Sequence, residues 1–166
     1  MRIQKMLGGF TVINSMEGVK VQGSVQIYSA TTNELLFEEH NLVVNTGLNH
    51  LLDLLDGTTG TPLALAKLAI GTGTSASTSN MTVLESEGFR KNINQIKREG
   101  LSIKTLTMLE MSEAIGTWTE AGLFLSDATD SANTGTLFSR VIFSPSVVKT
   151  DEDAIVIVWT ISLSSN

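Results

Sequence analysis

Apolar and polar residues alternate along most of this chain, which is the pattern of half-buried β-strands. The clearest early case is VKVQGSVQIY at residues 19–28, where valine and isoleucine recur at every second position. After a turn at 29–34, residues 35–44 are predicted to form the returning strand. Further strands are predicted over residues 64–71, 101–111, 116–126, 136–144 and 153–164.

The period changes once, where residues 46–56 predict a short helix. Within GLNHLLDLLDG, four leucines fall on a single stripe. They are Leu48, Leu51, Leu52 and Leu55. Asn45 or Thr46 is expected to cap the first turn, and Gly57 suits the positive φ that ends a helix. His50 lies between these leucines and is expected on the partly exposed polar face.

Six to eight strands with turn-rich links and one helix predict a mainly β fold, an antiparallel β-sandwich of the jelly-roll or immunoglobulin-like kind. Residues 17–166 are expected to form this single domain and residues 1–16 an N-terminal arm. The segment 83–97 fits either a helical turn plus a strand or one irregular strand. The Ser/Thr/Gly-rich segment 71–82 is expected to be a surface loop without a core of its own.

The composition of the chain argues against several classes of function. The net charge of −6 argues against nucleic-acid binding, because few basic residues are available to neutralise phosphates. The basic cluster in FRKNINQIKREG (89–100) is interpreted as a solvated strand edge rather than a phosphate contact. The chain has no cysteine, and no apolar run long enough for a signal peptide or a membrane span is present. The protein is therefore expected to be cytosolic when made.

Candidate chemistry is sparse, and neither an enzyme nor a cofactor is predicted. The glycines of AIGTGTS (69–75) lack the spacing of a phosphate-binding loop and are interpreted as a tight turn. Asp127, Asp130 and Asn133 carry oxygen ligands that Ca²⁺ uses, but clustered Asp and Asn are also typical of a long hairpin turn, which is the preferred interpretation. No nucleophile is paired with a base.

One carboxylate stands out, Glu120 in WTEAGLF (118–124). A catalytic base is one interpretation, and a buried structural partner is another. Strand alternation places Trp118, Glu120, Gly122 and Phe124 on one face, and a hairpin that pairs Phe124 with Thr136 would set Glu120 opposite Arg140. We therefore predict a structural Glu120–Arg140 ion pair that fixes the register, with Gly122 leaving room for the arginine.

Several segments, in order, resemble small structural proteins of tailed bacteriophages, a group of virion and tail-fibre-like proteins. These segments are NLVVNTGLNHLLDLL (41–55), LAIGTGTS (68–75), TVLESEGFRK (82–91), WTEAGLF (118–124), GTLFSRVIFSP (135–145) and VKTDEDAIVIVWTIS (148–162). The resemblance implies a non-enzymatic component of the virion, either a capsid decoration protein or an accessory part of the tail, fibre or baseplate.

Such domains work as symmetric oligomers, so the expected partners are further copies of the chain, as in a trimer, and other virion proteins. Val156, Val158 and Thr160 are the interface candidates, because the strand at 153–164 is apolar on both faces at its centre. The loops at 71–82 and 126–135 are candidates for an exposed tip or a contact with another virion protein. The alternative is a carbohydrate-binding β-sandwich that attaches to host-surface glycans, with Tyr28 as its best aromatic candidate.

Overall fold

A computed structural model describes residues 18–58 and 60–165, and over these residues the chain forms nine strands and one helix. The strands are β1 (Val19–Ser29), β2 (Leu35–Val43), β3 (Leu65–Gly71), β4 (Glu87–Asn92), β5 (Gln95–Glu99), β6 (Ser102–Leu109), β7 (Gly116–Leu125), β8 (Leu137–Lys149) and β9 (Ile155–Ser165), and the helix is α1 (Asn45–Asp56). All strand pairs are antiparallel, which confirms the predicted mainly β class with one helix. The predicted arm at 1–16 lies outside the described residues.

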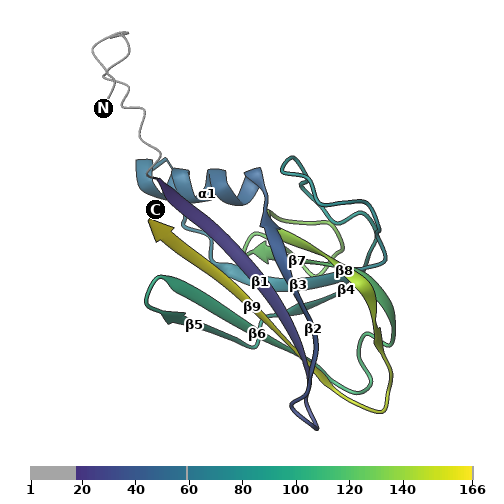
Figure 1. The fold of residues 1–166 in the computed structure, drawn as a ribbon. Coiled ribbons are helices and arrows are strands. Elements are labelled where there is room, and N and C mark those ends of the chain that lie inside the picture. The colour runs from purple at the N-terminus through teal and green to yellow at the C-terminus, as the bar shows by residue number, and fades with distance from the viewer. Residues whose placement is uncertain (1–17, 59, 166) are drawn as a thin grey trace, which may run out of the picture.

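The strands form one sheet in the order β4-β3-β7-β8-β2-β1-β9-β6-β5, and this sheet curls round as a half-barrel (Figure 1). Its two edge strands, β4 and β5, are consecutive in sequence, so the segment 83–97 contains two strand portions rather than one. The link between them joins the two edges through backbone hydrogen bonds. Ile93 N donates to Ala66 O, and Asn94 N donates to Leu106 O, both at 2.9 Å.

The main core lies inside the curl and draws side chains from both ends of the sheet. Trp159 and Ile157 of β9 are buried against Leu123 of β7 and Phe143 of β8 within a single cluster. The alternation read from the sequence explains these positions, because every second residue of β9 from Ile155 to Ile161 is buried.

Helix α1 lies across one end of the curl (Figure 1), and its rotation differs from the prediction. His50 is buried rather than on a polar face, and its Nε2 lies 2.9 Å from Leu63 O. Gly47 sets this rotation, because a Cβ there would lie 2.4 Å from Phe138 O. Only the first half of the predicted leucine stripe packs on the core, while Leu52 and Leu55 are exposed.

The helix begins after Val44, without a side-chain cap, so the predicted cap is wrong. Thr46 Oγ1 instead donates to Leu137 O, and Asn45 Nδ2 donates to Asn80 Oδ1. The predicted end is right, since Gly57 follows the helix with φ of 74°.

The outer face of the sheet differs between its two halves. Strands β3, β4, β7 and β8 form what we call the loop-covered half, where a second buried cluster lies outside the sheet. Its members are Val44, Ala69, Leu84, Phe124, Ala128 and Leu137, with Met81 packed against them. The segment 71–82 therefore does pack on a core, contrary to the prediction, because Met81 and the adjoining Leu84 reach into this cluster.

Strands β1, β9 and β6 form the bare half. Their outward side chains Tyr28, Val156 and Met108 lie in one row of the sheet, and Val158 and Leu106 lie side by side in the next. All five are half-buried, and neither buried cluster of the described residues includes them.

The β7–β8 hairpin has a different register from the predicted one. Phe124 pairs with Leu137 rather than Thr136, and Arg140 pairs with Gly122, while Glu120 pairs with Ile142. Irregularities between Leu123 and Phe124 and between Trp118 and Glu120 shift the strands against each other. Strict alternation fails at such bulges, because an extra residue changes which side chains share a face.

Candidate functional site

The Glu120 carboxylate lies beneath residues 72–86 and holds them on the sheet. Its side chain is fully buried, and Oε1 accepts hydrogen bonds from Gly73 N at 3.0 Å and Ser86 N at 2.7 Å. Oε2 accepts from Glu85 N at 3.1 Å. Both ends of the loop are thus bound to one buried anion, which satisfies these three backbone N–H groups without solvent.

Arg140 neutralises this anion from the neighbouring strand. Its Nε donates to Glu120 Oε2 at 2.9 Å, and Nη2 lies 2.8 Å from the same oxygen, with both side chains fully buried. Nη1 continues into the loop and donates to Ser75 O at 2.8 Å and to Ser77 Oγ at 3.2 Å. The structure thus brings Glu120 and Arg140 together, although they are diagonal neighbours rather than directly opposed.

The glycines of AIGTGTS belong to this arrangement. A Cβ on Gly71 or Gly73 would lie 2.6 Å or 2.5 Å from Glu120 Oε1, so only glycine lets the backbone approach the carboxylate. Gly122 was predicted to leave room for Arg140, but it leaves room for other side chains. A Cβ there would lie 2.9 Å from a Leu137 methyl carbon and 3.0 Å from one of Leu84, and Arg140 is not among its nearest neighbours.

This geometry does not suit Glu120 to act as a base. A general base must reach the proton that it abstracts, whereas this carboxylate is buried and already accepts four hydrogen bonds. Trp118 does not share its face, because Trp118 packs against the main core and its Nε1 donates to Ala114 O at 2.7 Å.

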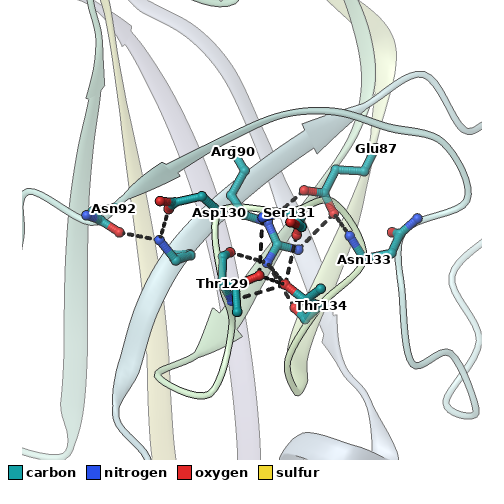
Figure 2. Close-up of polar contacts among 9 residues, drawn as sticks. Glu87, Arg90, Asn92, Thr129, Asp130, Ser131, Asn133 and Thr134 are labelled. Atoms are coloured by element: carbon teal, nitrogen blue, oxygen red, sulfur yellow. Dashed lines mark hydrogen bonds and ion pairs between the residues drawn. The ribbon is translucent and has the colours of Figure 1, made fainter.

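A second buried pair holds the loop at 126–135, and Figure 2 shows Arg90 at its centre. Arg90 Nε and Nη2 donate to the two oxygens of Glu87 at 2.7 Å and 2.9 Å, and the side chains are only 3% and 1% exposed. Nη1 donates to Thr129 O and Thr134 O, at 3.1 Å and 2.9 Å. The guanidinium also lies 4.3 Å from the centre of the Phe124 ring, a cation–π contact.

This buried pair differs from the solvated strand edge that the basic cluster at 89–100 predicts. Residues three apart in a regular strand point to opposite faces. The β3–β4 pairing passes from Ile70–Phe89 to Gly71–Glu87, and this bulge at Gly88 brings Glu87 to the side of Arg90. Gly88, which follows Glu87 two residues before Arg90, is the feature of the sequence that could have indicated this bulge.

The three candidate metal ligands bind protein groups rather than one another. Asp127 accepts from Thr136 N at 2.9 Å, and Asp130 accepts from Lys67 Nζ at 2.6 Å. Asn133 adopts φ of 56°, and its backbone N donates to Glu87 at 2.9 Å (Figure 2). Within residues 18–58 and 60–165, no group of three or more His, Cys, Asp or Glu side chains could hold a metal ion. The hairpin-turn interpretation fits these contacts.

Two surface carboxyls in these loops have lowered pKa values. The hydrogen bond from Lys67 and the charge of its ammonium lower the pKa of Asp130 below the ordinary 3.8. Hydrogen bonds from Ser75, first from its backbone N–H and then from its hydroxyl, lower the pKa of Glu85 below the ordinary 4.5. Both carboxyls are thus favoured in the charged form, in which Asp130 binds its loop to β3 and Glu85 binds two parts of the 72–86 loop together.

The interface candidates lie on the bare half. Val156, Val158 and Thr160 are half-buried and point outward from β9, opposite to the buried Ile157 and Trp159. Thr160 is paired with Ser24 of β1 and Lys104 of β6, so the apolar rows end there in a polar row.

Comparisons of the chain with protein-family models, with curated proteins and with solved structures find no match. Among the described residues, no helix is long and apolar enough to cross a membrane.

Proposed function

We propose that this chain is a non-enzymatic structural component of a tailed-bacteriophage virion, acting as an oligomer on the capsid surface or in the tail, fibre or baseplate. Two grounds support the proposal: the ordered motifs between residues 41 and 162, and a fold whose buried charges are used to hold loops rather than to form a reactive cleft.

The observation that carries the proposal is the contrast between buried polar networks and exposed apolar side chains. Glu120 with Arg140, and Glu87 with Arg90, fix two loops that together span one outer face. Such loops present a constant surface, as a particle component requires, because the buried charges resist rearrangement.

The bare half supplies the proposed contact with other copies. The apolar row at Val156 extends over three neighbouring strands, and the row at Val158 extends over β9 and β6. Contiguous apolar side chains on an outer sheet face favour a contact with another surface. A homo-oligomer would bury this face through a symmetric contact in which each copy uses the same residues.

The alternative function is glycan binding by the fixed polar loops. Stacking on a sugar would use Tyr28, which is half-buried beside Val156, because Trp118 and Trp159 both pack into the core. Tyr28 lies on the bare half, away from these loops. Glycan binding by the loops would therefore depend on the hydroxyl and amide groups of residues 72–86 and 126–135 rather than on stacking.

Mass spectrometry of purified particles from a phage that carries this gene tests the proposal. The chain should be present at a fixed number of copies per particle and stay bound after washing. When purified chain is added to particles that lack it, the chain should bind them and restore the same number of copies per particle. A chain that is found only in the infected cell and never in particles would contradict the proposal. The glycan alternative is tested by comparing how particles that contain the chain and particles that lack it attach to host cells.

A further inference from the structure

A cavity of about 450 Å³ opens at the end of the curl beside α1. We call it the helix-end cavity. Leu51 and Leu54 of α1 line one wall, and Ile96, Leu101 and Ile103 of the β5–β6 hairpin line the facing wall. Its lining is almost wholly apolar, so water inside it is poorly hydrogen-bonded and burial by an apolar occupant is favourable.

The helix and the hairpin that line the cavity both carry exposed apolar side chains. On α1, Leu52 is exposed and Leu55 is 84% exposed. On the hairpin, Leu101 is 66% exposed, and Ile96 and Ile103 are also exposed. Leu52 and Leu55 are not part of the cavity lining, so they add apolar surface on α1 beyond it, as at a protein–protein contact.

The two walls differ in charge. The last turns of α1 carry Asp53 and Asp56 and no basic residue, although carboxylates are unfavourable near a helix C-terminus. Across the cavity, Arg98 is exposed, and its Nε donates to Gly100 O at 3.2 Å. None of these three side chains takes part in an ion pair among the described residues.

We propose that the occupant is a second copy of this chain, with α1 of one copy seated against the β5–β6 hairpin of the next. Leu52 and Leu55 would enter the partner copy's helix-end cavity, and Arg98 would meet the acidic end of the incoming helix. The contact is self-complementary because one chain provides both its acidic apolar helix and its basic apolar hairpin. This inference deepens the proposed assembly role and uses a surface separate from the outer face of β9.

Light scattering measures the mass of the purified oligomer. Dividing this mass by the chain mass of 17.8 kDa gives the number of copies. Leu55→Ser should shift the mass towards that of the monomer, and it should leave the monomer's melting temperature unchanged because the side chain is already exposed. The matched control is Ile115→Ser. Ile115 is also an exposed apolar residue, but it precedes β7 at the opposite end of the sheet, and its replacement should leave the oligomer intact.

A charge exchange tests the pairing of the two walls. Arg98→Asp and Asp56→Arg should each weaken the oligomer, and the chain that carries both should recover it. Asp56→Arg also places a cation at the helix C-terminus, so lost assembly in that variant would not come from a weaker helix.

The outcomes separate this inference from the proposed function. An oligomer whose mass is unchanged by Leu55→Ser and by Arg98→Asp would overturn the helix-end contact and leave the assembly role standing. A monomeric wild-type chain would also overturn it. Absence from particles, by contrast, would contradict the proposed function itself.

Discussion

On the loop-covered half, Phe124 and Leu137 lie beneath residues that the chain supplies itself, whereas on the bare half Val156 and Val158 remain half-exposed. Both halves belong to one continuous sheet with apolar residues on both faces. The difference is that the links before β4 and before β8 are long and return across the sheet, while the links after β1 and before β9 are short turns.

This difference shows how the chain uses charge. A polar loop of Ser, Thr and Gly has little apolar area with which to hold its own position. Buried arginines replace that area, because each guanidinium binds a carboxylate and loop acceptors together. Among the described residues, no such loop covers the bare half, and the outward side chains of its apolar rows are half-buried.

The largest expected effect is that of Glu120→Gln on the loop-covered half. It leaves Arg140 buried without a counter-charge, which costs about 3–5 kcal/mol of unfolding free energy. Chemical denaturation of both chains measures the loss. Glu38→Gln, on exposed β2, is the matched control and should change stability by about 0.5 kcal/mol or less. Equal stability of wild type and Glu120→Gln would show that the buried pair does not stabilise the loop-covered half.

Arg90→Lys should have an intermediate effect. The lysine keeps the charge opposite Glu87 but cannot reach Thr129 O and Thr134 O at the same time, and hydrogen bonds from a charged donor contribute about 1.5–3 kcal/mol. Urea denaturation measures the change, and amide exchange at 126–135 should accelerate. The reverse exchange Lys97→Arg on exposed β5 is the control. Unchanged exchange in the loop would show that Arg90 does not hold it.

Val158→Thr probes the bare half and should cost about 1 kcal/mol or less in the isolated chain, since a half-exposed hydroxyl still reaches water. The same substitution at buried Val141 should cost about 1–3 kcal/mol, because the hydroxyl is buried. Thermal unfolding of dilute protein compares the two. If both variants lose the same stability, the outer face of β9 is already covered in a single chain.

The smallest effect is that of acid on the two surface carboxyls. Because the folded-state pKa values of Asp130 and Glu85 are lowered, their contribution to stability is complete above the ordinary values of 3.8 and 4.5. It is lost as the pH falls through the folded-state values. NMR titration of the carboxyl carbons should show both groups protonating below their ordinary values, and Asp130→Asn should remove part of the acid dependence. A titration of Asp130 at or above 3.8 would contradict the Lys67 contact.

The helix and all strands except β4 and β5 could be predicted, because period two and period 3.6 are set by burial on a regular backbone. The contact between Glu120 and Arg140 could also be anticipated, since each is a lone charge between apolar residues. The register of that hairpin could not be, because the bulges that displace Phe124 and Arg140 leave no trace in a strict alternation.

The loop contacts were hidden for a different reason. They depend on close approaches, where Gly71 and Gly73 bring backbone against Glu120 and Gly47 rotates α1 so that His50 is buried. A glycine in the sequence shows that a side chain is missing, and only the folded neighbours show what takes its place.

The most direct test of the account is thiol labelling, which the absence of cysteine from the chain makes specific to one introduced residue. Val158→Cys on the bare half and Thr78→Cys on the loop-covered half are labelled in the dilute chain and in assembled particles. The account predicts that Val158→Cys reacts when free and is protected on assembly, while Thr78→Cys keeps its rate. Equal reactivity of Val158→Cys in both states would contradict the claim that the bare half is the assembly surface.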